Sequence, residues 1–204
     1  MREQFDHIVV ATYSGLNDVL VRLGLERTRY RFQVAEKLIA LLPPAFAGTS
    51  IVVIDGPFGC ADPLDDTPLH VLGHVVETVH PANTALAPDV PEHLAPLIDA
   101  GLIRNPPFTR FPRVVEDLAR YIPGTEAAVH VGSMFTIRAV LAHQEATDTR
   151  PTLVERLDHQ VIRVFSGKLG TAVAAAERAL QLMGCAVATE ASAFAEAMEE
   201  RVGG

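Results

Sequence analysis

The residues best suited to chemistry lie near the end of the chain. An apolar run of β type, Val161–Phe165, meets a glycine-containing turn, and an alanine-rich run, Ala172–Leu180, follows it. The turn consists of Gly167, Lys168, Leu169, Gly170 and Thr171. A strand, a glycine turn and a helix start together aim backbone N–H groups at an anion or a polarised carbonyl. Lys168 and Thr171 add a cation and a hydroxyl at the same place.

A second candidate lies upstream of this turn. Arg150 is followed by Pro151, and Gly167 comes sixteen positions after that proline. A guanidinium can bind a carboxylate or a phosphate through two parallel N–H donors. The alternative is a surface arginine in a polar loop, paired with Asp148.

Four further segments belong to the same pattern. They are Phe5–Tyr13, which resembles a strand of the form D-x-V-V-x-A-T, Asp55–Phe58, Leu69–Val75 and Arg120–Gly124. With the Arg-Pro pair and the Gly-Lys-x-x-Thr turn, and in this order, they resemble the C-terminal part of FAD-dependent oxidoreductases. The superfamily is that of D-amino-acid oxidase, glycine oxidase and glycerol-3-phosphate dehydrogenase.

The chain departs from this family at its start. The family begins with a dinucleotide-binding βαβ unit that carries G-x-G-x-x-G and an acidic residue about twenty positions later. The 204 residues contain no such fingerprint, and the first strand is followed by a single glycine, Gly15. We therefore expect FAD to bind weakly or not at all to the isolated chain.

The resemblance implies a function and its residues. Hydride would pass from the carbon next to an amine or hydroxyl to flavin, with Arg150 orienting an anionic substrate group. Lys168 and the turn from Gly167 to Thr171 would stabilise the reduced ring. The FAD-binding half would come from a partner chain or from an N-terminal half of a longer product. Alternatively, the domain has become a flavin-free binding protein or a non-redox enzyme.

Composition excludes several classes of protein. The net charge is −8 and the pI is near 5.4, without a run of like charges, so we expect no nucleic-acid partner. The N-terminus lacks the features of a signal peptide, and no apolar run is long enough to span a membrane. Cys60 and Cys185 are too few for a disulfide framework. We expect a cytoplasmic protein that acts on a small molecule.

Other polar residues have a functional and a structural interpretation. On a strand, His70, His74 and His80 share one face, but His70 and His74 would lie about 13 Å apart, too far to share an ion. Three aspartates, Asp62, Asp65 and Asp66, either bind a hard cation or form turns. Neither Ser133 nor Cys60 has the flanking residues of a nucleophile. We therefore predict no metal site and no catalytic triad.

Hydrophobic patterning predicts the elements that must position these residues. Strands are expected at 8–11, 50–55, 69–80, 127–131, 136–141 and 161–165, and helices at 14–23, 91–100, 112–121, 172–183 and 191–201. The pattern at 30–42 is compatible with a strand or a helix, and we expect a strand because the resembled family has one there. Ser14 is the expected N-cap of the first helix and Gly24 its end. Segments 56–68 and 142–150 are expected to be loops.

These elements predict an α+β fold with a mixed, mainly antiparallel sheet and helices packed on one side, as in the substrate domain of amino-acid oxidases. We expect a single domain over residues 1–204. Its parts are a remnant of the FAD domain (1–24), the substrate-domain sheet and helices (25–150) and the flavin-contacting strand, turn and helix with a tail (151–204). Without the FAD domain, exposed apolar elements favour a homo-oligomer or an obligate partner.

Overall fold

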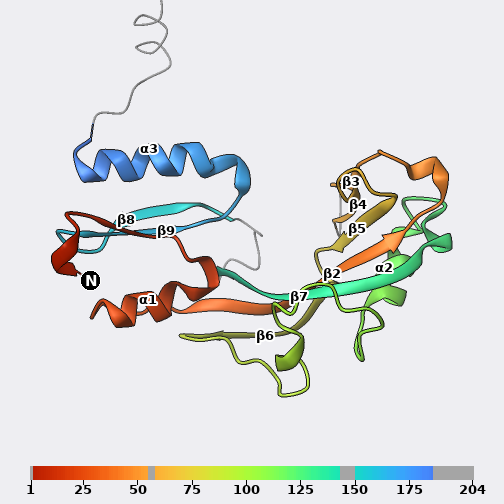
Figure 1. Cartoon of the computed structure of the whole chain (residues 1–204), viewed down its shortest axis with the longest axis horizontal. Coiled ribbons are helices and arrows are strands. Elements are labelled where there is room, and N and C mark those ends of the chain that lie inside the picture. The colour runs from red at the N-terminus through yellow and green to blue at the C-terminus, as the bar shows by residue number, and fades with distance from the viewer. Residues whose placement is uncertain (1, 55–57, 143–149, 186–204) are drawn as a thin grey trace, which may run out of the picture. The chain divides into compact units, whose positions relative to one another are not determined.

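The computed structural model describes residues 2–54, 58–142 and 150–185, which fall into two compact units (Figure 1). Unit 1 joins the two ends of the chain, residues 1–28 and 143–204, and unit 2 is the continuous segment 29–142. Both units combine helices with a sheet, and the larger sheet is mainly antiparallel, which confirms the predicted fold class. That the units form a single domain stays a prediction.

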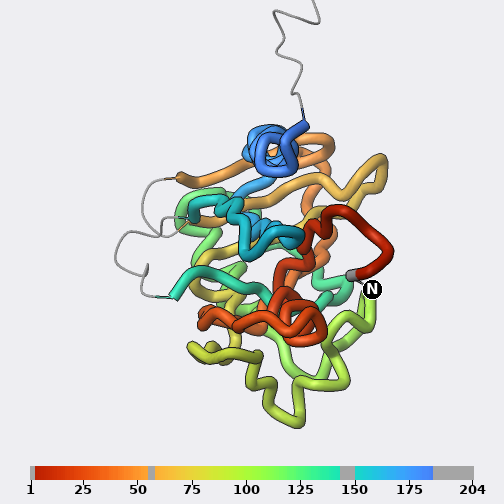
Figure 2. The backbone as a smooth tube through the Cα atoms, turned by 90° about the vertical axis from the view of Figure 1, so that its left-hand side faces the viewer, coloured from red at the N-terminus to blue at the C-terminus, as the bar shows by residue number. Residues whose placement is uncertain are grey.

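Unit 1 contains a three-stranded sheet in the order β1-β9-β8. Strand β1 (Ile8–Val10) runs parallel to β9 (Val161–Phe165), and β8 (Leu153–Arg156) pairs antiparallel with β9. Helix α3 (Ala172–Met183) lies along β8 and β9 and is seen nearly along its axis in Figure 2. It buries Ala175 and Ala179, because only small side chains allow such close packing. Strand β8 was not anticipated from the sequence.

Helix α1 (Leu16–Arg22) follows β1 and buries Leu16 and Leu20. The expected N-cap, Ser14, is wrong: it lies in a preceding 3-10 turn, η2 (Tyr13–Gly15), and Gly15 is the N-cap without a side-chain hydrogen bond. The expected end is confirmed, since Gly24 adopts a φ of +72°, which favours glycine.

Unit 2 is organised by one long central strand, β2 (Tyr30–Leu41). One edge of β2 pairs along its whole length with β7 (Val129–Leu141). The other edge pairs first with β6 (Val79–Ala85) and then with β5 (Leu69–His74). Strands β4 (Gly59–Pro63) and β3 (Ile51–Val53) extend the sheet beyond β5, to six strands in all.

The two faces of this sheet differ. Residues with even numbers in β2, from Phe32 to Ala40, define what we call the even face, and residues Arg31 to Leu41 with odd numbers define the odd face. The even face carries the core: Leu38 and Ala40 pack with Leu72 and with Val114 and Leu118 of α2 (Phe111–Leu118). Val34 packs with Leu94, Leu97 and Phe135 at the other end of the same face.

Two expected strands have different bounds. The single strand expected over 69–80 is β5 and β6 separated by a turn. The turn forms because the His74 Nδ1 accepts the backbone N–H groups of Val76 and Glu77, at 3.2 and 3.0 Å. Conversely, the strands expected at 127–131 and 136–141 are one strand, β7, which runs through Gly132 and Ser133.

Two further expectations are wrong. The expected helix at 91–100 is only a 3-10 turn, η4 (Ala95–Leu97), because Pro96 removes a backbone donor from the middle of the segment. The expected loop at 56–68 contains β4, which β3 and β5 hold from both sides.

The remaining short 3-10 turns are η1 (Arg2–Gln4), η3 (Pro44–Phe46), η5 (Thr125–Ala127) and η6 (Leu169–Thr171). The expected helix at 191–201, most of the expected loop at 142–150, and Asp148 lie outside the described residues. Among the helices that are described, none has the length and apolarity needed to cross a bilayer.

Candidate functional site

The structure brings the two predicted site segments of unit 1 into direct contact. A Cβ atom added to Gly167 would lie 2.0 Å from the carbonyl oxygen of Arg150 and 2.7 Å from that of Pro151. No side chain fits there, so the residue must be glycine for the turn to reach the Arg-Pro segment. Arg150 and the glycine turn therefore form one local structure, as their pairing in the sequence predicts.

Thr152 joins the two segments through a chain of hydrogen bonds. Its Oγ1 accepts the backbone N–H of Gly167 at 3.0 Å and lies 2.5 Å from Oγ1 of Thr171. The Thr171 hydroxyl donates to the carbonyl of Lys168 at 2.7 Å, so Thr152 donates to Thr171. The Thr171 hydroxyl therefore donates within the turn and stabilises the conformation of the turn. Sequence reasoning missed Thr152, although it directly follows the Arg-Pro pair.

The middle of the turn faces outward. Leu169 is 91% exposed, Lys168 and Gly170 are exposed, and a Cβ on Gly170 would meet nothing within 4 Å. Thr171 caps α3 without a side-chain hydrogen bond to the helix. The backbone N–H groups of Thr171 and Ala172 are bonded to the carbonyls of Lys168 and Leu169 within the turn, so the exposed Lys168 is the group here that suits negative charge.

These residues fit one end of a flavin. The exposed lysine and the helix start would stabilise charge on a reduced ring, and Gly170 leaves space next to the turn. The printed sequence contains no Gly-rich dinucleotide fingerprint for the pyrophosphate and adenine. That this turn binds the ring of a flavin stays a prediction.

In unit 2 the most elaborate polar cluster surrounds Glu36, which is fully buried on the even face. Its Oε1 accepts the hydroxyls of Thr109 and Ser133, both at 2.6 Å. Its Oε2 accepts the backbone N–H of Arg110 at 2.8 Å and lies 2.9 Å from Nε2 of His80. Sequence reasoning missed Glu36, although a lone acid among the apolar even positions of a central strand is a visible signal.

Burial by itself raises the pKa of Glu36, because it removes water from the charged form. Hydrogen bonds from His80, Ser133, Thr109 and the Arg110 backbone outweigh this effect and hold the pKa of Glu36 below its ordinary value. The carboxylate is therefore charged at neutral pH. His130 extends the cluster, with Nε2 3.0 Å from the Ser133 hydroxyl and its ring stacked on Phe111. In a nucleophilic triad the acid would orient the histidine that contacts the serine. Here Glu36 contacts Ser133 itself and not His130, so this arrangement is not a nucleophilic triad.

The three histidines lie on two strands. His70 and His74 are buried on β5, where Nε2 of His70 lies 3.0 Å from the carbonyl of Phe46 and Nε2 of His74 lies 2.7 Å from Asp117. His80 belongs to β6, so the expectation that all three share one strand is wrong. Within the described ranges, no cluster of three or more histidine, cysteine or acidic side chains has metal-binding geometry.

The remaining candidates have structural roles. Asp65 lies in the turn before β5 with a φ of +51°, and Asp62 in β4 accepts the Ser50 hydroxyl at 2.5 Å. Burial, and then a hydrogen bond to Asp62 and its charge, raise the pKa of Cys60 to about 11. The thiol is therefore protonated at neutral pH and a poor nucleophile.

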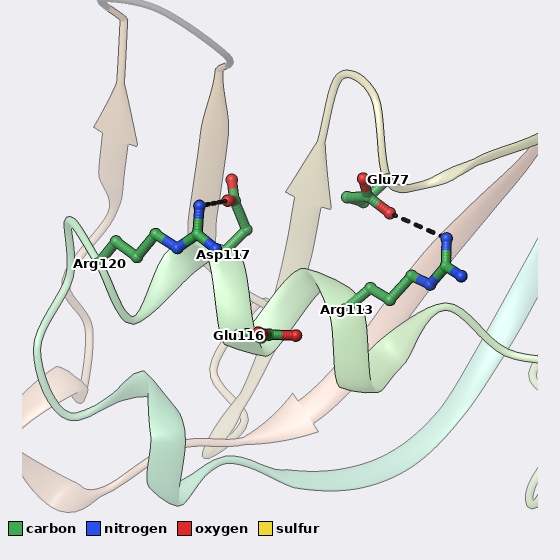
Figure 3. A pocket seen from close by; sticks show the side chains of 5 residues that line it. All are labelled: Glu77, Arg113, Glu116, Asp117 and Arg120. Carbon is green, nitrogen blue, oxygen red and sulfur yellow. Dashed lines mark ion pairs between the residues drawn. The ribbon is translucent and has the colours of Figure 1, made fainter.

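A pocket lies between α2 and the turn that joins β5 to β6 (Figure 3). It is lined by Glu77, Arg113, Glu116, Asp117 and Arg120. Arg120 pairs with Asp117 at 3.1 Å, and Arg113 reaches Glu77 at 4.0 Å. Each cation has an acidic neighbour, and Glu116 is a third acid beyond these two pairs, so the lining has no excess of positive charge for an anionic ligand.

The solved structures similar to this chain are oxidases and a deaminase of amino acids and related compounds. Glycine oxidase from Geobacillus kaustophilus matches with a TM-score of 0.56 and 15% identity, over 92% of this chain and 44% of that chain. L-amino acid deaminase from Proteus vulgaris matches with a TM-score of 0.57 and 11% identity, over 90% of this chain and 49% of that chain. Iminodiacetate oxidase from Chelativorans sp. BNC1 matches with a TM-score of 0.52 and 15% identity, over 91% of this chain and 44% of that chain.

These likenesses confirm the expected resemblance at the level of the fold. The chain has the fold of part of an amino-acid-oxidase-type enzyme and spans less than half the length of the solved structures it matches. No protein-family model and no curated protein sequence matches it.

Proposed function

We propose that the chain is the substrate-side part, with the ring-side turn, of an FAD-dependent oxidoreductase of the amino-acid-oxidase type. The substrate would be a small amine or hydroxy compound with an anionic group. The observation that supports this most directly is the backbone contact between Gly167 and Arg150. It unites a candidate anion-binding arginine with a candidate ring-binding turn, in a fold shared with amino-acid oxidases.

In this proposal, a bound flavin supplies the acceptor for a hydride from the carbon next to the amine or hydroxyl. Arg150 binds the anionic group of the substrate and fixes the orientation of that carbon. Lys168 and the start of α3 stabilise negative charge on the ring. Thr152 and Thr171 keep the turn in place through their hydrogen bonds to Gly167 and Lys168.

The FAD-binding half would come from a partner chain or from an N-terminal half of a longer product. In the described part of unit 1, β1 pairs with β9 alone, so one edge of a parallel strand is available to another strand. Parallel sheets normally have neighbours on both edges and cover on both faces. This edge is where we expect an FAD-binding half to attach.

The test is the visible absorption spectrum of the purified chain, alone and after addition of FAD. We expect a colourless protein or weak flavin binding, because the pyrophosphate and adenine contacts are missing. Co-expression with a protein that carries a G-x-G-x-x-G βαβ unit should yield a yellow complex that substrate bleaches under anaerobic conditions. A stoichiometric yellow protein without any partner would contradict the proposed division of the cofactor site.

The alternative function is a flavin-free binding protein or non-redox enzyme. One observation favours this alternative. The Thr171 hydroxyl donates its hydrogen bond to the Lys168 carbonyl within the turn, so it is not available as a donor to a flavin. This alternative requires a ligand that binds with Arg150 in the absence of any flavin. Ligand binding that FAD and a partner leave unchanged would support it over the oxidoreductase.

A further inference from the structure

A groove of about 390 Å³ lies in unit 1 between helix α3 and strand β8. This volume is in the range of roughly 300–1,000 Å³ that is common for sites that bind small molecules. Four of the residues that line the groove are apolar, Leu153 and Val154 of the strand and Ala174 and Ala175 of the helix. The groove is therefore suited to an apolar molecule, and the residues at its two ends decide which polar group that molecule carries.

One end of the groove lies at a pair of hydroxyls. Oγ1 of Thr152 is 2.5 Å from Oγ1 of Thr171, so this pair joins the strand to the start of the helix. Thr152 donates to Thr171, and Thr171 donates to the carbonyl of Lys168. Both hydroxyl protons are engaged, so this end provides no hydroxyl donor for an anionic group of a ligand.

Arg178 and Glu155 line the other end of the groove. Along the strand, Glu155 follows Thr152 by about 10 Å, at roughly 3.3 Å per residue. Along the helix, Arg178 follows Thr171 by about the same distance, at roughly 1.5 Å per residue. The groove thus has room for an extended ligand of this length between the hydroxyl pair and the guanidinium.

The negative charge of Glu155 is neutralised within the sheet. Successive side chains of a strand point to opposite faces, so Val154 lies on the α3 side with Thr152, and Glu155 points to the opposite side. There Glu155 forms an ion pair with Arg163, whose Nε donates to the carboxylate at 3.1 Å. Glu155 therefore does not repel an anion that lies on the α3 side.

The positive charge of Arg178 has no such partner. Its Nη1 donates to the neutral Oε1 of Gln181 at 3.4 Å. In the described part of the chain, no acidic side chain forms an ion pair with Arg178. A guanidinium binds a carboxylate through two parallel N–H donors, and a single cation matches a single negative charge. This end of the groove is thus complementary to a carboxylate.

We propose that the groove between α3 and β8 binds a small monocarboxylate with an apolar body. The carboxylate pairs with Arg178, and the apolar body lies over Val154, Ala174 and Ala175 toward the hydroxyl pair. Burial of the apolar body supplies affinity, and the ion pair fixes the direction of the ligand. The site goes beyond the proposed redox function and uses neither the Arg-Pro arginine nor the lysine of the turn, so its failure would leave that function untouched.

The experiment is a titration of the ¹⁵N-labelled full chain with sodium hexanoate at constant ionic strength. Sodium acetate and hexylammonium chloride are the comparison ligands, because acetate lacks the apolar body and hexylammonium has the opposite charge. We expect saturable amide shifts with hexanoate, centred on residues 153–155 and 174–178. The two comparison ligands should bind about tenfold more weakly or not at all.

Two variants with matched controls make the assignment specific. Arg178→Gln should weaken hexanoate binding about tenfold or more, because the charge-assisted contact is lost. Its control is Arg22→Gln, which removes an equal charge from an exposed position of α1 and should bind like the original chain. Ala174→Phe, at an exposed position, should fill the groove and abolish binding. Its control is Ala176→Phe, at another exposed position of α3 that does not line the groove.

Several outcomes would overturn the proposal. Equal binding of acetate would indicate a site for any small anion, and equal binding of hexylammonium would indicate unspecific apolar adsorption. Hexanoate affinity that falls as the protein concentration rises would show that a second copy of the chain covers the groove. The absence of saturable shifts, or equal affinity in a variant and its control, would also contradict the assignment.

Discussion

The carboxylate of Glu36, in the middle of β2, accepts the backbone N–H of Arg110, the residue that precedes α2, at 2.8 Å. A residue of the sheet thus accepts a backbone donor at the start of the helix, where the N-cap residue Arg110 makes no side-chain bond of its own. Thr109 assists, since its hydroxyl donates to Glu36 and accepts the N–H of Phe111. The contact fixes α2 to the even face at the helix terminus.

Glu36→Gln should lower the free energy of unfolding by about 2–3 kcal/mol at pH 7, because an amide group would face donors where a carboxylate oxygen accepted them. Urea denaturation measures this change. The control Glu116→Gln, at an exposed position of α2, should change stability little. Equal effects of the two substitutions would contradict the capping role.

The same carboxylate predicts a response to acid. Because the pKa of Glu36 is lower in the folded state, its contribution to stability is fully present above the unfolded pKa of about 4.3 and is lost as the pH falls through the folded value. Denaturation midpoints measured between neutral pH and pH 3 should therefore decrease in the original chain. Glu36→Gln should decrease less over the same range, and an unchanged slope would count against this assignment.

Gly167→Ala should disrupt the candidate flavin site, because the added Cβ would lie 2.0 Å from the Arg150 carbonyl oxygen. The two backbones must separate, at a cost of about 1–3 kcal/mol or more. Gly170→Ala is the control, since the same methyl group meets nothing within 4 Å there. Thermal unfolding compares the two, and a stable Gly167→Ala would mean that the Arg-Pro contact is not required.

Arg150 and Lys168 should affect different measurements in whatever assembly binds flavin. Arg150→Ala should weaken substrate binding by about 1.5–3 kcal/mol, and Arg150→Lys should rescue it poorly, because an ammonium cannot reproduce two parallel donors. Lys168→Ala should leave substrate affinity nearly intact and lower the flavin's reduction potential. Titration calorimetry and redox titration separate these effects. Unchanged affinity and turnover in Arg150→Ala would refute the role of the Arg-Pro pair.

We also predict that the isolated chain associates through unit 1. Val9 of β1 and Val173 of α3 are 43% and 72% exposed, and Leu169 projects from the turn. Exposed apolar side chains beside an unpaired strand edge favour self-association or a partner. Sedimentation velocity should show an oligomer that Val9→Lys or Val173→Lys weakens. A monomer over a wide range of concentration would contradict this prediction.

Sequence patterns located the helices and strands that have a regular apolar repeat. They missed the elements whose conformation depends on pairing with strands distant in the sequence. Helix α3 and strand β9 were predicted within a residue, because alanine and β-branched residues favour them locally. Strand β4 was not, because Gly59 to Pro63 has a weak β propensity and is held by β3 and β5. A Cβ on Gly59 would lie 2.4 Å from Cδ2 of Leu118, so a larger residue there requires the Leu118 side chain to shift, and no local pattern shows this contact.

The candidate site was also predicted only in part, because some of its residues are recognised from the local sequence and others depend on contacts between distant residues. Arg150 and the Gly167 turn are identified by residue type and spacing, and their contact follows from the antiparallel pairing of β8 with β9. The role of Thr152 depends on a hydrogen bond to Gly167, fifteen positions away. Glu36 requires Thr109, Ser133 and His80, which only the folded sheet brings together.

The pairing of β2 with β7 also constrains how the protein folds. Tyr30 opens the central strand and pairs with Leu141, the last residue of β7, so the sheet closes only after the whole segment between them has been synthesised. Contacts so distant in sequence slow folding, because a long loop must be ordered before any pairing energy is gained. During translation, β2 therefore remains without its longest partner, and a nascent chain arrested before β7 exposes an unpaired strand edge prone to aggregation.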